Sequence, residues 1–535
     1  MARTYRVTVP FASEDGKSIN ELLTVDDLLS VSEPIIDRAI LPIEEALSKA
    51  NLRPQDIDMI ILAGGSSQLP RVSEKIEQLL GKRPRKIPRK LMLAVSYGAA
   101  LYHRDLLNLP QLRNESRILG EDMGLRVSDR GRQTSKLLMP HNTTLPREEE
   151  FTFPVAQGQK RATIQLVVLD SVTGEVKYYL KQRDLVLSQH ANRIQVKLSV
   201  DENRMINVTA YNPDHPEDQS TICVSQSRLS EIEAQTYRDK LGITIDEHTR
   251  SGLSQQCIGI DLGTTTSELA TATRSTDIAE LDELENPDIS HSNGLLAPYC
   301  FPSIVYFQDG TNSIEISSTA ALNARNDANA DDKVFYNFKT QQIDKELGSV
   351  NGTPLRMQDL SAYVLSKIWS TAQSEFDGSL SSAVITVPAA FTVDQCEATY
   401  NAAIMAGIPN VTLIDEPTAA YYYYRHIQQI DSERIKNVLV FDFGGGTADI
   451  AILDVSGGGK QMSSYKDNVF AVKATSGDPT CGGRDIDKAL LEEVVHRFEV
   501  KNGTKITPAA LNKLKDKIEE AKVKLSEAYA DSMED

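Results

Sequence analysis

Cysteine is scarce in this sequence, and long apolar runs are absent. The five cysteines, at positions 223, 257, 300, 396 and 481, are scattered, and no two form a C-x-x-C pair. This excludes a disulfide framework and a zinc site built on paired cysteines, and it indicates a reducing compartment. No stretch approaches the 18 apolar residues of a membrane-spanning helix, and the start MARTYRVTVP has no apolar leader segment. We therefore expect a soluble cytoplasmic protein without a membrane partner.

Basic residues are fewer than acidic residues. The 535 residues contain 57 Lys and Arg against 75 Asp and Glu, a formal net charge of −18. A general nucleic-acid binder would carry a basic face, so we expect no nucleic-acid partner. The P-loop pattern G-x-x-x-x-G-K-[ST] is also missing, since SGGGKQ at 456–461 has no Ser or Thr after its lysine and is interpreted as a turn. A chain of this length should form several domains.

Two similar segments stand out against these absences. Residues 438–450 (VLVFDFGGGTADI) predict a buried strand that ends at Asp442 and a turn at Gly444, Gly445 and Gly446. Such glycines let the backbone approach a phosphate, and Asp442 is placed to hold hydrated Mg²⁺. A glycine-rich turn with incidental acids is the alternative. Residues 257–269 (CIGIDLGTTTSEL) repeat the pattern. Two copies indicate two related half-domains that face one nucleotide.

Helix and strand patterns alternate at both ends of the chain and enclose a β-rich middle. Strand 59–63 runs into GGSSQLPRV, where the Gly64–Gly65–Ser66 turn could meet a phosphate or sugar edge or could serve packing alone. Short strands at 151–155, 163–169, 177–180, 193–200 and 206–210 predict an antiparallel β-sandwich. A helix is predicted over 225–241, and Trp369, the only tryptophan, is expected in a core.

These motifs together resemble the seventy-kilodalton heat-shock chaperone family, whose ATPase domain has the actin-like fold. The matching text is GIDLGTTTSELA, AVITVPAAF, LIDEPTAAYYYY, VFDFGGGTADIAIL, VKATSGDPTCGGRDID, IILAGGSSQLPRV, AVSYGAAL, HNTTLP and LSVDENRMINVTA. The resemblance covers nearly the whole chain. It implies an α/β fold with an actin-like (duplicated ribonuclease-H-like) two-lobed ATPase domain, plus an antiparallel β-sandwich domain for substrate.

The order of the motifs differs from that of the family, whose members begin with the DLGTTTS-like hairpin. Placing residues 257–535 before 1–241 restores the family order. Two explanations account for this order. The chain is a circular permutant that folds onto itself through the connector at 242–256, or it is a segment of tandem copies that carries the end of one copy and the start of the next. The implied domains are 1–108, the C-terminal part of the nucleotide-binding domain; 109–122, a linker; 123–224, the β-sandwich; 225–256, a truncated lid helix and connector; and 257–535, the N-terminal part of the nucleotide-binding domain.

The resemblance also implies the site. ATP or ADP with Mg²⁺ is the expected ligand, with K⁺ as a further candidate cation. Asp261 and Asp442 would hold the metal through water. The implied catalytic residues are Lys339, Glu416, Asp442 and Thr447. The implied nucleotide-binding residues are Asp261, Gly263, Thr264, Thr265, Thr266, Gly444, Gly445, Gly446, Thr447, Gly482, Gly483, Glu519, Lys522, Ser526, Gly64, Gly65 and Ser66. Phosphoryl transfer depends on such positioning and electrostatics.

Several residues depart from the family pattern. Cys396 stands where the family has an arginine that relays nucleotide state, Met92 replaces an aspartate, and Gln68 replaces an arginine. The linker lacks the family's leucine run, and SDRGRQTS at 128–135 is polar for a peptide site. Two functions follow: an ATP-hydrolysing chaperone that binds unfolded or extended peptide, with co-chaperones or a nucleotide-exchange factor as candidate partners, or a nucleotide-gated regulatory module with weak hydrolysis and a specific protein partner. A sugar kinase or actin-like filament protein shares the fold but lacks the β-domain.

Overall fold

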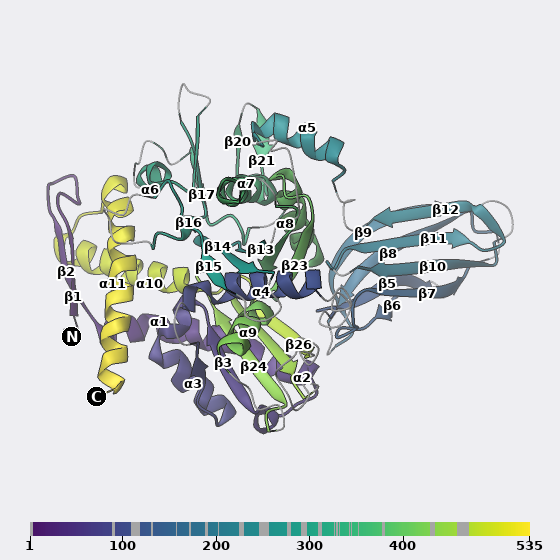
Figure 1. Cartoon of the computed structure of the whole chain (residues 1–535), viewed down its shortest axis with the longest axis horizontal. Helices are drawn as coiled ribbons and strands as arrows, with labels where there is room; N and C mark the ends of the chain where they lie inside the picture. The colour runs from purple at the N-terminus through teal and green to yellow at the C-terminus, as the bar shows by residue number, and fades with distance from the viewer. Residues whose placement is uncertain are drawn as a thin grey trace.

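In the computed structural model, two α/β lobes lie side by side and a β-rich part projects from them (Figure 1). The described residues leave out 109–117 of the predicted linker 109–122, 246–255 of the predicted lid-and-connector segment 225–256, and the glycines of SGGGKQ. The structure describes residues 4–87, 91–108, 118–129, 132–156, 158–170, 173–187, 191–201, 203–223, 229–245, 256–274, 280–289, 297–308, 313–325, 327, 330, 332–341, 343, 345–350, 352–376, 380–428, 434–456 and 470–534.

Each lobe is built on one mixed sheet, and the two sheets share a topology. The first runs β15-β14-β13-β22-β23, with β16 beside β14, and the second runs β26-β25-β24-β3-β4. In both, an antiparallel hairpin (β13–β14, β24–β25) is followed by parallel neighbours. The strands are β13 (Gln256–Asp261), β14 (Thr266–Thr273), β15 (Leu281–Glu283), β16 (Cys300–Pro302), β22 (Ala383–Val387), β23 (Val411–Asp415), β24 (Asn437–Phe443), β25 (Ala448–Asp454), β26 (Ala471–Asp478), β3 (Met59–Ala63) and β4 (Arg85–Lys86).

The second sheet joins distant parts of the chain. Strand β3 pairs in parallel with β24, with Ile60 opposite Leu439 and Ala63 opposite Asp442. All five residues of β3 are buried. A strand that is apolar throughout suits a parallel sheet covered on both faces. The N-terminal segment therefore completes the sheet that carries residues 438–450, within one chain.

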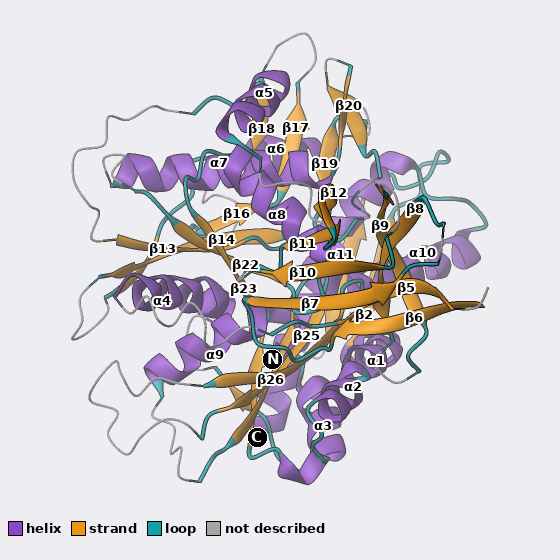
Figure 2. Ribbon diagram, turned by 90° about the vertical axis from the view of Figure 1, so that its right-hand side faces the viewer, coloured by secondary structure: helices purple, strands orange, loops and turns teal. Residues whose placement is uncertain are grey.

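Two helices fill the space between the sheets: α4 (Ala94–Asn108) and α9 (Glu416–Ile427). A side chain on Gly98 would overlap the backbone of Ala419, and one on Gly259 would overlap the backbone of Ala100. Glycine at these two positions therefore lets α4 touch α9 and β13 closely, which ties the lobes together. Figure 2 shows both helices from another side.

The outer faces of the sheets carry further helices. Helices α7 (Met357–Glu375) and α8 (Val393–Met405) cover the first sheet, and Trp369 is buried there as predicted. The second sheet packs on α1 (Val25–Ile40), α2 (Pro42–Lys49), α3 (Pro70–Leu80), α10 (Gly483–Asn502) and α11 (Pro508–Glu534). The smaller elements are β1 (Thr4–Val9), β2 (Ile19–Thr24), β17 (Ile304–Phe307), β18 (Ile314–Ile316), β19 (Val334–Tyr336), β20 (Gly348–Val350), β21 (Thr353–Leu355), α6 (Thr319–Arg325), η1 (Pro54–Asp56), η2 (Gly65–Gln68) and η3 (Leu91–Leu93).

The projecting part is a sandwich of two antiparallel sheets around one apolar core. One runs β12-β11-β10-β7 and the other β6-β5-β8-β9. The strands are β5 (Asp122–Asp129), β6 (Arg132–Met139), β7 (Arg147–Pro154), β8 (Arg161–Leu169), β9 (Val176–Val186), β10 (Arg193–Val200), β11 (Ile206–Asn212) and β12 (His215–Cys223). The predicted fold class, an actin-like two-lobed domain with a β-sandwich, is thus confirmed.

Some details differ from the sequence prediction. Helix α5 (Glu231–Leu241) begins six residues after the predicted start at 225, because Ser230 caps it and its side chain accepts from Glu233 N–H. The polar stretch 128–135, interpreted as a loop, lies largely in the strands β5 and β6.

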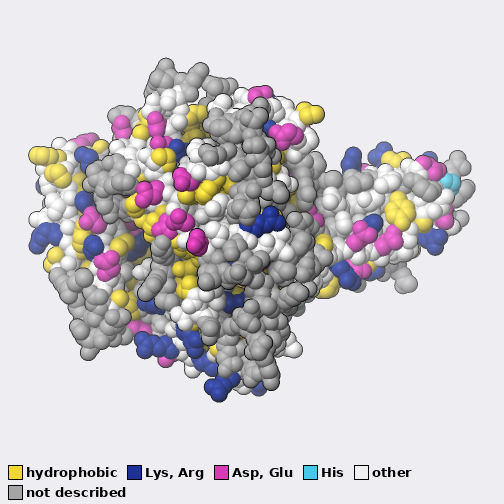
Figure 3. All heavy atoms as spheres, in the orientation of Figure 1, with side chains coloured by type: hydrophobic (Ala, Val, Ile, Leu, Met, Phe, Trp, Pro, Cys, Tyr) yellow, Lys and Arg dark blue, Asp and Glu magenta, His cyan; other side chains and the backbone are white. Residues whose placement is uncertain are grey.

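Within the described ranges, no helix has the length and apolarity that a bilayer span needs. Figure 3 shows acidic and basic side chains interspersed over one face.

Candidate functional site

The glycines at 444–446 form a turn that packs against the start of α10. Gly444 N–H donates to Thr447 O at 3.0 Å, which closes the turn. Gly483 N–H donates to Gly444 O at 3.0 Å. A Cβ on Gly482 would overlap the backbone of Gly446. The backbone segments can lie this close only because side chains are absent.

The Gly64–Gly65–Ser66 turn reaches the same place from the other end of the chain. Ser66 Oγ donates to Gly444 O at 2.9 Å. Gly64 has a φ of 77°, and a Cβ there would overlap Asp442 Oδ1. The two predicted glycine turns, 378 residues apart, are therefore in direct contact.

The hairpin of the first lobe faces this turn. A Cβ on Gly445 would lie 2.7 Å from Thr265 Oγ1, and one on Gly446 would lie 2.9 Å from Thr264 Oγ1. The oxygen Thr265 Oγ1 is buried without a hydrogen-bond partner. The two hairpins thus present hydroxyl and glycine surfaces to one another, and the space between them is lined by both lobes.

Ser303 supports the hairpin of the first lobe through two hydrogen bonds. Ser303 Oγ donates to Gly263 O at 2.7 Å, and Ser303 N–H donates to Thr265 O at 2.9 Å. Thr266 opens β14, opposite Pro302 of β16. The hairpin therefore depends on how β16 is held.

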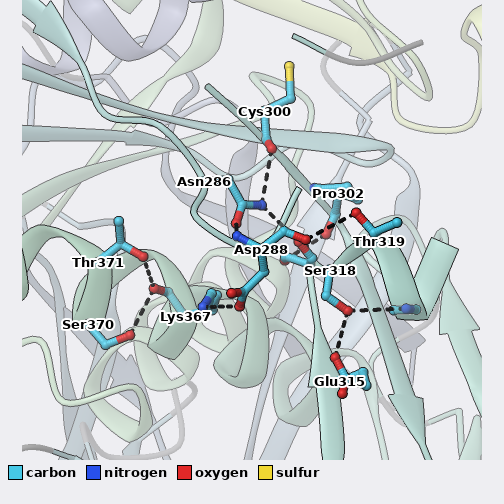
Figure 4. A network of polar contacts seen from close by, with 12 residues as sticks. Asn286, Asp288, Cys300, Pro302, Glu315, Ser318, Thr319, Lys367, Ser370 and Thr371 are labelled. Carbon is cyan, nitrogen blue, oxygen red and sulfur yellow. Dashed lines mark hydrogen bonds and ion pairs between the residues drawn. The ribbon is translucent and has the colours of Figure 1, made fainter. Parts of the chain in front are cut away.

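A polar network holds the loop that precedes β16 (Figure 4). Asn286 Nδ2 donates to Cys300 O at 3.2 Å and to Ser317 O at 2.8 Å. Thr319 N–H donates to Asp288 O at 3.0 Å, and Lys367 of α7 pairs with the Asp288 carboxylate. The network links β16, α6 and α7, so the hairpin rests on fixed elements.

Lys339 and Glu416 form a buried ion pair beside the hairpins. Lys339 Nζ lies 2.6 Å from Glu416 Oε1, and the lysine is 2% exposed. Burial is the largest influence and alone would lower the pKa of Lys339, but the carboxylates of Glu416, Asp261 and Asp449 together outweigh it and the net shift is upward. Glu416 is the first residue of α9, where a carboxylate meets the positive end of the helix dipole. The ammonium group is therefore fixed and charged.

Four more carboxyl groups gather here: Asp261, Glu268, Asp442 and Asp449. Thr386 Oγ1 donates to Asp261 Oδ1 at 2.8 Å, and Asp442 lies opposite Asp449 in the β24–β25 hairpin. Burial raises the pKa of each, that of Asp449 to about 6. Carboxyl groups that are buried close together favour binding of a cation, because the cation offsets their negative charge.

Three residues that the family resemblance assigns to adenosine lie at the edge of this arrangement: Glu519, Lys522 and Ser526. Lys522 Nζ donates to Asp487 Oδ2 at 2.7 Å and to Gly483 O at 3.3 Å. Ser526 Oγ donates to Lys522 O one turn away on α11. Glu519, three residues before Lys522, is near enough to help raise the pKa of Asp487, a shift due chiefly to burial. One face of α11 therefore meets the glycine turns.

The residues present fit a magnesium–nucleotide complex. Besides Thr265 Oγ1, the buried oxygens Asp449 Oδ2 and Asp487 Oδ1 have no hydrogen-bond partner. The glycine turns pack so closely that added side chains would overlap or crowd neighbouring atoms, except at Gly444, where a Cβ would meet nothing nearer than Thr447 O at 3.9 Å. Among the described residues, no group of three or more His, Cys, Asp or Glu could hold an ion directly. A metal ion that Asp261 and Asp442 hold indirectly, through its water shell, is compatible with this finding.

Sequence reasoning missed four side chains of this site: Glu268, Thr386, Asp449 and Arg484. Glu268 and Asp449 sit inside apolar strands, where alternation of inward and outward residues could have indicated that they face the hairpins. Arg484 follows the glycine pair at 482–483, and its proximity in sequence was the only signal. Thr386 carried none.

The β-sandwich reaches the two-lobed part next to Glu416. Arg204 Nη2 lies 2.8 and 3.0 Å from the two oxygens of Asp415, the residue before Glu416. Arg204 and Asp415 are both buried. Cys396, the residue noted in place of an arginine, also lies against Arg204. The arginine at this contact therefore comes from the β-sandwich.

Comparison with known proteins gives two findings. A family profile described as "Hsp70 protein" matches residues 2–248 and 257–534, nearly the whole chain. A heat shock cognate HSP70 protein of Trypanosoma brucei brucei is 41% identical over 179 residues. That match covers 33% of this chain and 25% of the relative, so it spans a quarter of the relative's length.

Proposed function

Because the chain belongs to the Hsp70 protein family, we propose that it is an ATP-binding molecular chaperone that hydrolyses ATP to control binding of unfolded peptide segments. The observation that carries this proposal is the meeting of three glycine turns, 64–66, 444–446 and 482–483, with the Thr264–Thr265 hairpin. Successive glycine turns at strand and helix ends are suited to phosphate.

The residues divide into three roles. Thr264, Thr265 and Thr447 hold phosphate oxygens with the glycine turns. Asp261 and Asp442 hold the water shell of Mg²⁺, and K⁺ is a further candidate cation. Bound Mg²⁺ supplies charge neutralisation for the phosphates. Lys339 and Glu416 orient the attacking water and stabilise negative charge. Slow hydrolysis is consistent with a site that acts as a switch.

The β-sandwich is the proposed peptide-binding part. Extended peptide can bind such a domain through strand-like backbone contacts. Arg204 supports communication with the ATPase part, because it contacts the residue that precedes Glu416. Co-chaperones and a nucleotide-exchange factor are candidate partners. The buried, unpaired thiols of Cys257, Cys300, Cys396 and Cys481 support a reducing, cytoplasmic setting.

A second candidate is a nucleotide-gated regulatory module with weak hydrolysis and a specific protein partner. The polar side chains of 128–135 favour it, since a site for apolar peptide segments would be less polar.

Nucleotide-dependent peptide affinity separates the two candidates. A labelled apolar peptide should bind at least about tenfold more weakly with a non-hydrolysable ATP analogue than with ADP, as for a typical coupling energy. Fluorescence anisotropy measures both affinities, and Asp442→Asn, expected to lose the metal, is the matched control. Equal peptide affinities in the two nucleotide states would eliminate the chaperone mechanism.

The order of the elements supports a further part of the proposal, a circularly permuted family architecture. Helix α11 lies against β1, and Tyr529 OH of α11 donates to Glu74 Oε1 at 2.9 Å. Figure 1 shows both termini on the same side of the molecule. In the family order, α11 would run into β1, and their contact allows that connection.

A further inference from the structure

The hydrogen-bond partners of Arg484 are neutral, although the residue lies at the glycine turns. Its Nε donates to Gly445 O and its Nη2 donates to Thr340 Oγ1, both at 3.3 Å. By contrast, Arg38 and Arg497 pair with carboxylates at 2.7 Å. In the described part of the chain, no carboxylate lies within ion-pair distance of the half-buried Arg484 guanidinium.

The guanidinium lies between the lobes. Gly445 belongs to the second lobe, and Thr340 follows Lys339 in the first. A Cβ on Gly446 would overlap Arg484 Nη2 and would also come within 2.9 Å of Thr264 Oγ1. The arginine therefore occupies the space where the two hairpins face each other.

Its position along the site is also defined. The adenosine-side residues gather at Gly483 and Gly444, where Lys522 and Ser66 make their contacts. Arg484 instead donates to Thr340, the residue that follows Lys339 in the chain. Burial lowers the pKa of Arg484, which marks an incompletely solvated cation. Such a cation is stabilised by an anion that reaches the same space.

We propose that Arg484 is a phosphate-binding residue that contacts the terminal phosphate of ATP, so that this chain carries an arginine in addition to Lys339 for recognising the triphosphate. This inference rests on the proposed function. When nucleotide binds, the guanidinium exchanges the weak Thr340 contact for phosphate oxygens. A planar guanidinium can offer two parallel N–H donors to a phosphate. The site then distinguishes ATP from ADP by the phosphate that only ATP has.

The test compares nucleotide affinities in the full chain. Arg484→Gln should weaken binding of a non-hydrolysable ATP analogue by about tenfold to a hundredfold, the value of a charge-assisted hydrogen bond, and leave ADP affinity within about twofold. Arg484→Lys should recover part of the loss, because charge remains while the fork is lost. Arg497→Gln, on the same helix, is the matched control and should change neither affinity. Calorimetry measures the affinities, and melting curves without nucleotide show that each variant is folded.

Three results would overturn the proposal. Equal losses for ATP and ADP would make Arg484 a bridge between the lobes. Unchanged affinities would remove it from the site. A parent chain that binds neither nucleotide would end the proposed function itself, and the parent measurement identifies that case before any variant is compared.

Discussion

Lys339→Met is expected to slow single-turnover ATP hydrolysis by about a hundredfold to a thousandfold, with ATP affinity changed by less than about tenfold. The lysine is 2% exposed and its Nζ lies 2.6 Å from Glu416 Oε1. A fixed ammonium group in a water-poor site stabilises charge that develops on the phosphate, and methionine fills its volume without that charge. Hydrolysis of γ-labelled ATP under excess enzyme measures the effect.

Controls separate chemistry from folding in this experiment. Removing Lys339 leaves Glu416 buried without its cation, so melting curves of Lys339→Met without nucleotide test whether lost stability explains lost turnover. Lys345→Met, where the lysine is exposed and hydrogen-bonded to Gln341, should turn over ATP like the parent. If the parent and Lys339→Met hydrolyse ATP equally slowly, the enzymatic proposal is wrong.

Arg204→Gly is expected to release the β-sandwich from the ATPase part and to reduce nucleotide control of peptide affinity by at least about tenfold. Removing one partner of a buried ion pair costs about 3–5 kcal/mol, because the other charge is left uncompensated. Here that charge is Asp415, next to Glu416. Small-angle scattering should show a larger radius of gyration, and peptide anisotropy should show the lost coupling.

Glycine is the informative substitution because Arg204 has a φ of 63°. A non-glycine residue in this region carries backbone strain, and a strained residue often has a functional contact that retains it. The turn itself is closed by Arg204 N–H donating to Asp201 O at 3.0 Å, which glycine preserves. Arg204→Gly therefore relaxes the turn while it removes the ion pair. Arg193→Gly, which breaks the exposed pair with Asp214, serves as the control.

One outcome for Arg204→Gly would contradict a role of the Arg204–Asp415 pair in coupling. A variant Arg204→Gly that stays as compact as the parent, with peptide affinity still set by nucleotide, would show that the Arg204–Asp415 pair does not carry the coupling. Nucleotide control would then run through other contacts between the parts, such as Asn142 Nδ2, which donates to Lys49 O at 2.9 Å.

Much of the site could be predicted because its backbone requirements are visible in the sequence. The apolar runs that end at Asp261 and Asp442, followed by glycine or threonine, indicated strand ends with tight turns. The structure brings these two turns together. The pairing of β3 with β24 could not be derived from periodicity, since any buried strand would match, and it came only through the resemblance.

Isolated charges were the hardest features to predict. No motif marks the charged residues Arg204, Glu268 and Arg484. Each lies in an ordinary polar or alternating stretch, where a solvated surface residue is the simplest interpretation. Only the fold shows that Arg204 is buried against Asp415 and that Arg484 lies between the lobes. The partners of Arg204 and Arg484 are at least 39 residues away in sequence.

The central claim is that one chain builds the whole nucleotide site from its two ends. Native mass spectrometry with Mg²⁺ and ATP tests it most directly, because it reports the number of chains and nucleotides in one particle. We predict a particle of one chain with one bound nucleotide, and loss of that nucleotide in Asp442→Asn. Nucleotide found only on particles of two chains would contradict the account, since residues 59–66 and 438–446 would then meet between molecules.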